Sequence, residues 1–297
     1  MVSKFNIGGM ITALFTPLTP KEQLKEDAFK RLIDFQIENG INGFFALGTA
    51  GEGIKLSTEK RKKGAETVVK YTRGRIPIIL HVGNPDTERT VELAKHGEGL
   101  GVDALSAVGP FYYKPDLKGL IQHYKRFAEA VNIPVFVYNI PGRQGYNISP
   151  EFFGKIVEEV PQIVGLKDTS YDVGQLQDYV HKFGEKYTVL GAGDSLIFSA
   201  LAVGTDGHIS QISNAFPEMA IQIYRLIKEG KYEEAREIQF RLNDVLEVLK
   251  KGPEISSVKE VLKMRGIDVG VSSSPLRQPS KEESIAIREG LETIGVL

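Results

Sequence analysis

Residues 134–168, PVFVYNIPGRQGYNISPEFFGKIVEEVPQIVGLKD, contain two apolar runs with one helix pattern between them. Both runs are short and rich in branched side chains, which is typical of strands buried on both faces. Between them, Ser149, Pro150 and Glu151 form a helix start: a capping hydroxyl, a proline at the first helical position and an acid in the first turn. The order strand, helix, strand predicts a parallel pair joined by a crossover.

The same alternation recurs along most of the chain. Eight apolar runs are separated by helical patterns, and each run ends near glycine, proline or a polar residue. Eight such units closing on themselves make an α/β fold, the (β/α)8 TIM barrel. A doubly wound open sheet is the alternative, but it normally has fewer strands, and no GxGxxG follows the first run. The runs are residues 8–17, 43–48, 77–83, 104–110, 134–140, 163–168, 188–193 and 207–213.

Only helical patterns follow the eighth run. We expect the first of four to close the barrel and the other three to form an extension packed on it, since no low-complexity linker intervenes. The predicted units are residues 1–230, a catalytic (β/α)8 barrel, and residues 231–297, a C-terminal three-helix extension.

Charge and composition argue against several classes of function. Lys and Arg total 37 against 38 Asp and Glu, so the net charge is −1 and no basic excess suggests nucleic acid or an anionic membrane surface. Cysteine is absent, which excludes a disulfide framework, a thiolate nucleophile and cysteine metal sites. Residues 1–15 do not match a signal peptide and no apolar run has the length of a membrane span, so we expect a cytoplasmic protein.

Lys167 is the most informative single residue. It ends the apolar run 163–168, where an ammonium without a partner would be costly to bury. Desolvation lowers the pKa of such a lysine and makes it an amine nucleophile, which suits Schiff-base chemistry with a carbonyl substrate. A lysine that extends to water from a strand end is the alternative.

Other polar residues follow neighbouring strands at the rim where TIM-barrel active sites form. The turn GTAGEG, residues 48–53, can direct backbone N–H groups at an anion, and Tyr138 can transfer protons. Arg143 offers a fork that suits a carboxylate. Together with Lys167 these groups suit a keto acid. We do not expect metal catalysis, because the five histidines show no HxH or HExxH spacing, although His81 and His208 lie on predicted strands.

The motifs GTAGEG, YNIPGRQG and GLKDTS, in this order, resemble those of the pyruvate-dependent class I lyases, which include dihydrodipicolinate synthase, N-acetylneuraminate lyase and 2-keto-3-deoxygluconate aldolase. The likeness extends over essentially the whole chain. It implies that Lys167 forms the Schiff base and that Tyr138 shuttles protons. Thr49 would link Tyr138 to Tyr112 in a proton relay, with Tyr112 reaching into a neighbouring subunit's site. The family is usually tetrameric, a dimer of dimers, and needs no metal or organic cofactor.

The resemblance also suggests substrate contacts. Gly48 and Ala50 lie in the turn that holds the pyruvate carboxylate, and Ile209 has a backbone carbonyl near the substrate. Arg143 matches the arginine that binds the carboxylate of aspartate semialdehyde. It favours the 4-hydroxy-tetrahydrodipicolinate synthases of lysine biosynthesis, since a buried bidentate partner discriminates strongly. Ala50, where synthases usually have threonine, and Thr169, which resembles the hydroxyl-binding threonine of sugar-acid lyases, point the other way.

Three functions therefore remain at this point. The first is condensation of pyruvate with L-aspartate semialdehyde, and the second is a sugar-acid aldolase that uses pyruvate and glyceraldehyde. The third belongs to another class: a barrel that binds a keto acid without turnover. We also predict that lysine does not inhibit the protein, since the positions corresponding to the inhibitor site of bacterial synthases hold Arg61, Pro85, Arg89 and Phe111.

Overall fold

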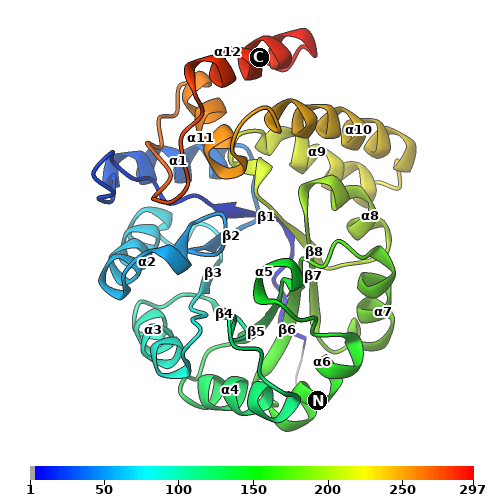
Figure 1. Ribbon diagram of the computed structural model, residues 1–297. Coiled ribbons are helices and arrows are strands. Elements are labelled where there is room, and N and C mark those ends of the chain that lie inside the picture. The colour runs from blue at the N-terminus through cyan, green and yellow to red at the C-terminus, as the bar shows by residue number, and fades with distance from the viewer. Residues whose placement is uncertain (1–3) are drawn as a thin grey trace.

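Eight parallel strands close into a barrel in the computed structural model, which describes residues 4–297 (Figure 1). The strands pair in chain order, and β8 returns to pair with β1. The predicted (β/α)8 barrel is therefore confirmed, while residues 1–3 of its first unit lie outside the described residues. The strands are β1 (Gly9–Leu14), β2 (Gly43–Ala46), β3 (Ile78–His81), β4 (Ala104–Val108), β5 (Val135–Asn139), β6 (Ile163–Asp168), β7 (Thr188–Ala192) and β8 (Gly207–Ser210).

A ring of helices surrounds the strands (Figure 1). Side-chain oxygens begin several of them: Ser57, Asp86 and Ser149 each accept a backbone N–H from the first turn. The ring comprises α1 (Glu26–Glu38), α2 (Thr58–Thr72), α3 (Thr87–Gly99), α4 (Leu117–Glu129), α6 (Pro150–Glu159), α7 (Val173–Phe183), α8 (Ile197–Ala202) and α9 (Pro217–Lys228).

Short helical turns lie at the carboxyl ends of four strands. The four-residue helix α5 (Pro141–Gln144) follows β5 directly and lies over the barrel mouth in Figure 1. The 3-10 turns η1 (Gly53–Lys55), η2 (Asp194–Leu196) and η3 (Ile212–Asn214) follow β2, β7 and β8. These segments, rather than the outer helices, carry side chains toward the end of the barrel where the strands finish.

The barrel interior is a packed core. All strand residues are buried except Val164, which is partly exposed. Burial of both strand faces explains why the runs are nearly continuous in Val, Ile, Leu and Phe instead of alternating with polar residues. It also means that a charged strand residue such as Lys167 is placed in apolar surroundings.

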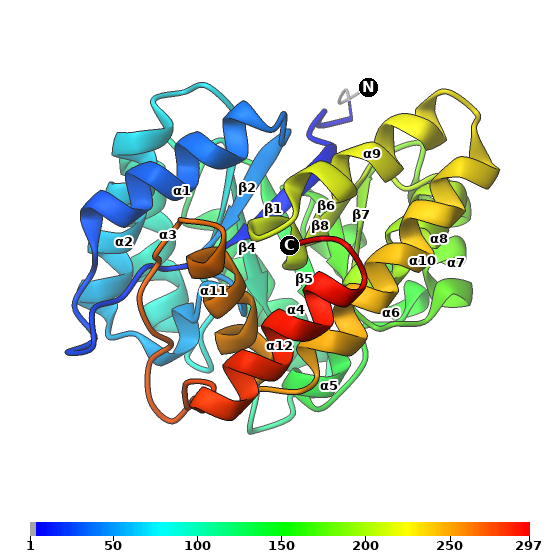
Figure 2. The ribbon, with the colours of Figure 1, turned by 90° about the horizontal axis from the view of Figure 1, so that it is seen from above.

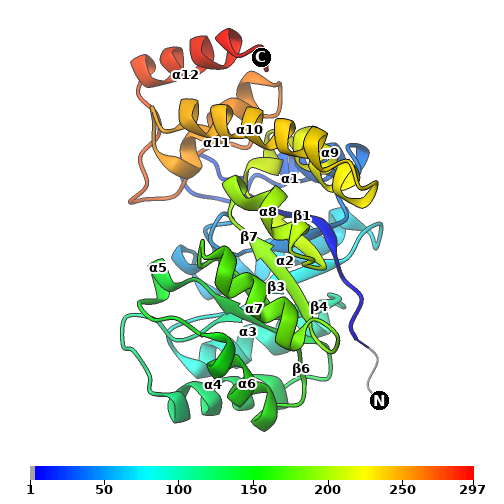
Figure 3. The same cartoon turned by 90° about the vertical axis from the view of Figure 1, so that its right-hand side faces the viewer.

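Three further helices follow the barrel: α10 (Tyr232–Leu249), α11 (Glu254–Met264) and α12 (Lys281–Thr293). Figures 2 and 3 show them together on one side, with α12 outermost and α10 beside α9. The three predicted helices are thus present. The division of the chain into two units, residues 1–230 and 231–297, stays a prediction. Within residues 4–297, no helix has both the length and the apolar character needed to cross a bilayer.

Candidate active site

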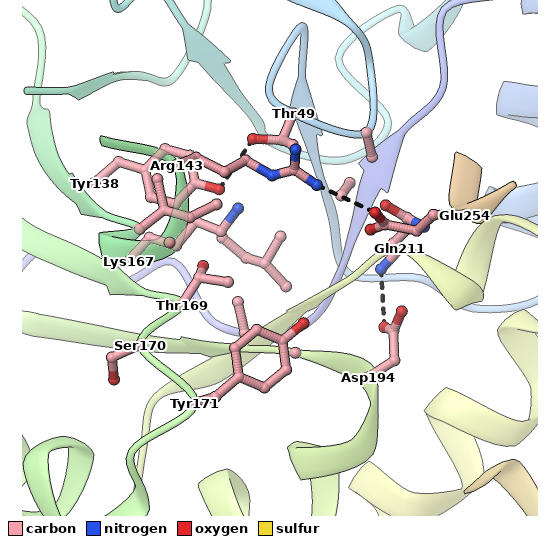
Figure 4. A pocket seen from close by; sticks show the side chains of 17 residues that line it. Thr49, Tyr138, Arg143, Lys167, Thr169, Ser170, Tyr171, Asp194, Gln211 and Glu254 are labelled. Carbon is pink, nitrogen blue, oxygen red and sulfur yellow. Dashed lines mark hydrogen bonds and ion pairs between the residues drawn. The ribbon is translucent and has the colours of Figure 1, made fainter. Parts of the chain in front are cut away.

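A cavity of about 540 Å³ opens at the carboxyl ends of the strands, and Figure 4 shows its lining. Strands β5 and β6, the turn after β2, helix α5 and the N-terminal end of α11 all contribute to it. Seven of the residues selected from the sequence lie there together: Thr49, Ala50, Tyr138, Arg143, Lys167, Thr169 and Ile209.

Lys167 projects into this cavity from β6. Its residue is only 5% exposed, and its Nζ lies 4.1 Å from the centroid of the Phe45 ring and 4.0 Å from that of Tyr138. Burial lowers the pKa of Lys167 below its ordinary value, while Tyr138 and the carboxylate of Asp194 act in the opposite direction. The side chain is enclosed between rings and does not extend to water, so the amine is available neutral at lower pH than a surface lysine.

Strand register brings Tyr138 beside Lys167. The two residues are direct partners in the β5–β6 ladder, so both side chains lie at the same end of the barrel. The Tyr138 hydroxyl and Thr49 Oγ1 are 3.2 Å apart, within hydrogen-bonding distance, with either oxygen able to donate. A hydroxyl pair next to a buried amine can move a proton between substrate and solvent.

The turn after β2 offers backbone donors to the cavity. The N–H groups of Thr49 and Ala50 donate to no acceptor within residues 4–297, and both residues line the cavity. Successive free N–H groups in a turn form a concavity that suits an anion. Gly48 does not line the cavity. A side chain there would meet the Phe45 ring at 2.4 Å, so its role in the structure is close packing.

Arg143 lies at the mouth and is less buried than the sequence interpretation required. Its side chain is 53% exposed, and it donates one hydrogen bond of 3.1 Å to Glu254 of α11. The expectation of a closed, bidentate site is therefore wrong for this conformation, because α5 places Arg143 at the rim of the cavity and an acid of the extension already holds it.

Several polar residues of the cavity were not predicted from the sequence. Asp194 follows β7, and its carboxylate accepts hydrogen bonds from Ser210 Oγ (2.8 Å) and from the N–H groups of Gln211 (2.9 Å) and Ile212 (3.0 Å). Burial raises the pKa of Asp194 to about 6. The strand-end rule that selected Lys167 would also have found Asp194, whereas nothing local marks Glu254. Ser170, Tyr171, Gln211 and Glu254 complete the missed set.

Thr169 and Ile209, the two other expected substrate contacts, both line the cavity, but only Thr169 presents an unpaired hydroxyl. Thr169 Oγ1 is buried and has no hydrogen-bond partner in the part of the chain that the structure describes. Because an unpaired buried hydroxyl is costly, it marks a place where a bound molecule could supply the partner. Ile209 lines the same cavity from β8.

Tyr112 is absent from this cavity. The residue is 88% exposed and adopts a left-handed backbone conformation with φ of 74°, which is unfavourable for a bulky side chain. A second cavity of about 230 Å³ lies behind Thr49 and Tyr138 and is lined mainly by apolar side chains such as Val108 and Phe111. The chain's own Tyr112 does not line it.

His81, His208 and Arg61 have structural partners and do not line the cavity that holds Lys167. The His81 ring contacts the Leu47 carbonyl and the His208 ring the Gly193 carbonyl, and no group of three acidic or histidine side chains suited to a metal occurs within residues 4–297. Arg61 is buried and donates to the carbonyls of Gly83 and His81. Of the other three positions tied to lysine inhibition, Pro85 and Arg89 are exposed and Phe111 is partly buried.

Comparisons with known proteins agree with this geometry. The family model described as "Dihydrodipicolinate synthetase family" matches residues 6–294. The 4-hydroxy-tetrahydrodipicolinate synthase of Methanocaldococcus jannaschii is 33% identical over 97% of this chain and 99% of that protein. The crystal structure of dihydrodipicolinate synthase from Aquifex aeolicus superposes with a TM-score of 0.91 at 33% identity, covering 98% and 99% of the two chains. CdNal from Clostridium difficile, in complex with mannosamine, gives 0.93 at 28%, covering 98% and 100%.

A (β/α)8 barrel with a buried lysine at its rim, similar over its full length to these proteins, is a class I pyruvate-dependent lyase. The chain belongs to the dihydrodipicolinate synthetase family. Both the family and the class of enzyme predicted from the motifs are confirmed.

Proposed function

We propose that Lys167 condenses with pyruvate to form an imine. The observation that carries this proposal is the position of its amine, buried between the rings of Phe45 and Tyr138 at the floor of a cavity that is large enough for a keto acid. The amine adds to the ketone carbon and water leaves. Loss of a methyl proton then gives an enamine, with the imine nitrogen as electron sink. The enamine carbon attacks an aldehyde, and hydrolysis of the new imine frees Lys167.

Tyr138 and Thr49 are the groups proposed to move these protons. Their 3.2 Å contact lies next to the Lys167 amine, so a proton from the reacting centre can pass to the hydroxyl pair. The pyruvate carboxylate would accept from the free N–H groups of Thr49 and Ala50, with Gly48 shaping their turn and the Ile209 carbonyl near the keto acid. These residues then need no metal or organic cofactor.

The relay is completed, in this proposal, by Tyr112 from a second copy of the chain. Tyr112 is exposed and strained in the single chain, and the cavity of about 230 Å³ behind Thr49 and Tyr138 is of a size to accept an aromatic side chain. A pair of chains exchanging this tyrosine is the minimal assembly, and a homotetramer built as a dimer of dimers is the proposed state.

The acceptor aldehyde is proposed to be L-aspartate semialdehyde, which makes the protein a 4-hydroxy-tetrahydrodipicolinate synthase. Arg143 supports this choice because it is the cavity cation that remains once Lys167 has reacted, and its fork suits the carboxylate of the acceptor. Relatives bearing that name match the chain over nearly their whole length.

A sugar-acid aldolase acting on pyruvate and glyceraldehyde is the second candidate. It is favoured by the unpaired Thr169 hydroxyl and by the acids Asp194 and Glu254 of the same cavity, since these groups suit hydroxyls better than a carboxylate. Glu254 also occupies Arg143 in the free protein.

A competition distinguishes the two. Pyruvate is offered with L-aspartate semialdehyde or D-glyceraldehyde, and product identity is followed together with pyruvate loss. Preference for the semialdehyde, reduced at least about tenfold in Arg143→Ala but not in Thr169→Val, supports the synthase. Preference for glyceraldehyde with the opposite mutational pattern supports the aldolase. If borohydride traps no pyruvate on Lys167, both proposals fail and binding without turnover remains.

A further inference from the structure

A buried ion pair joins the extension to the turn that carries Thr49. Lys259 of α11 donates to Glu52 Oε1 at 2.6 Å, and the two side chains are 1% and 0% exposed. Lys259 also donates to the carbonyls of Thr16 (3.2 Å) and Val271 (2.8 Å), so all three of its N–H donors are used. One ammonium thus ties together the end of β1, the turn after β2, α11 and the segment that follows it.

The second oxygen of Glu52 is held as firmly. Oε2 accepts from the N–H (2.8 Å) and Oγ (2.9 Å) of Ser273 and lies 2.7 Å from Lys55 Nζ. A buried carboxylate with every direction occupied has one available geometry. Glu52 itself has φ of 56°, so the side-chain contacts also hold an uncommon backbone conformation in place.

Glu52 is three residues from Thr49 and is bonded to it through the backbone. The Glu52 N–H donates to the Thr49 carbonyl (3.0 Å), and Thr16 Oγ1 donates to the Gly51 carbonyl (2.6 Å). Thr49 then contacts Tyr138, whose ring covers the Lys167 amine. Glu52 does not line the cavity that holds Lys167, but together with Thr49 and Tyr138 it lines the second cavity of about 230 Å³. Its effect on Lys167 therefore passes through the turn or through that second cavity.

Stability alone is a poor explanation for this pair. Two buried charges lose nearly as much in desolvation as they gain in attraction, and well-packed apolar residues would often do as well. What the pair supplies is a fixed position for the turn. We infer that Glu52 and Lys259 are positioning residues that set Thr49 against Tyr138, so that the C-terminal extension acts on the reaction through the turn after β2. This inference rests on the proposed role of Thr49 in proton transfer.

The test uses Glu52→Gln/Lys259→Met, which leaves no unpaired buried charge, and Ser256→Ala as control. Ser256 Oγ donates to Ser272 Oγ (2.9 Å) in the same buried junction of α11 without touching Glu52, so its loss perturbs the junction but not the turn. Circular dichroism establishes folding. Exchange of the pyruvate methyl protons with deuterium, followed by NMR, measures the proton-transfer step, and borohydride trapping measures imine formation.

We expect the double variant to fold and to trap pyruvate, with its exchange rate lowered at least about tenfold, and Ser256→Ala to exchange at the wild-type rate. The discriminating measurement repeats the double variant in a Thr49→Val background. If Glu52 acts through Thr49, the two losses do not multiply, because the second change removes nothing further.

Wild-type exchange in the folded double variant overturns the inference, as does a loss that multiplies fully with that of Thr49→Val. Should Glu52→Gln/Lys259→Met not fold, Glu52→Gln alone, which keeps the shape and two polar atoms of the side chain, is carried through the same cycle.

Failure of the proposed function is distinguishable from failure of this inference, because the unmodified protein would then trap no pyruvate. In that case the NMR signal of the Thr49 methyl group still reports the position of Thr49. If the inference holds, this signal moves in the Glu52 variants but not in Ser256→Ala. If the inference fails, it is unchanged in both.

Discussion

Arg143 donates a hydrogen bond of 3.1 Å to Glu254, and both residues line the cavity that holds Lys167. The carboxylate of an acceptor has to compete with this acid for the arginine. We therefore expect Glu254→Gln to lower KM for L-aspartate semialdehyde by up to about fivefold, because exposed ion pairs are worth roughly 0.2–1 kcal/mol. Values of kcat should change little.

Glu260→Gln is the matched control, since it removes the same charge from the same helix without lining the cavity. Steady-state kinetics at low and moderate salt measure the effect, which should shrink as salt screens the charges. An equal fall in KM for neutral glyceraldehyde would show that Glu254 does not act on acceptor charge.

Lys167 should reduce the stability of the fold it serves. Its pKa is lowered by burial, so the folded protein resists protonation there while the unfolded chain binds a proton up to about the ordinary value of 10.5. The destabilisation by Lys167 is fully present at pH values below the pKa of Lys167 in the folded protein. It disappears as the pH rises above the pKa of this lysine in the unfolded chain. We expect Lys167→Met to raise the thermal midpoint by roughly 2–5 °C near neutral pH, from a gain of about 1–2 kcal/mol.

Calorimetry of both proteins between pH 6 and 11 checks this expectation. The difference in thermal midpoint between Lys167→Met and the unmodified protein should narrow toward pH 11. The variant should trap no pyruvate with borohydride at any pH. A midpoint lowered at neutral pH would mean that the contacts of the ammonium with Phe45 and Tyr138 outweigh its desolvation.

Asp194 should influence the pH at which Lys167 reacts. Its carboxylate, whose pKa burial raises to about 6, favours the charged form of the lysine when ionised. Removing this charge in Asp194→Asn lowers the pKa of Lys167 further, so more amine is neutral at a given pH above about 6. The acid limb of the trapping rate should move to lower pH by about half a unit to one unit. Asp178→Asn, which removes an exposed charge on α7, should leave the acid limb of the trapping rate unchanged. A shift of this limb to higher pH in Asp194→Asn would contradict the electrostatic argument.

The sequence was sufficient for the barrel and for the reactive residues of the cavity, though not for most of its lining. Burial on both faces makes strands such as β5 and β6 visible as apolar runs, and the rule that chemistry lies at strand ends selected Lys167 and Tyr138. Helix α5 has four residues and no periodicity, so the exposed position of Arg143 could not be foreseen. Glu254 reaches the cavity, and Lys259 the turn after β2, from a helix more than eighty residues beyond Lys167, and only the tertiary fold makes these contacts.

Inhibition by lysine is expected to be absent. The Arg61 guanidinium is buried and already donates to two backbone carbonyls, and Pro85 supplies no backbone N–H for a ligand. A titration of the condensation rate with L-lysine should therefore be flat up to millimolar concentrations. Strong inhibition in that range would show that another surface binds the amino acid, and saturation kinetics against pyruvate would distinguish a distant site from competition.

The placement of Tyr112 leads to a complementation experiment. If this exposed tyrosine enters the cavity behind Thr49 of a second copy, it serves a Lys167 that is not on its own chain. Tyr112→Phe and Lys167→Ala should each be nearly inactive alone. In a mixed dimer, the chain with the intact lysine receives the intact tyrosine of its partner, so one site in two is restored. Random mixing in equal amounts should recover about a quarter of the wild-type activity.

Unfolding and refolding the two variants together, and comparing the activity with that of each variant refolded alone, measures this recovery. No recovery, with mixed dimers verified by mass spectrometry, would mean that Tyr112 does not act across the interface.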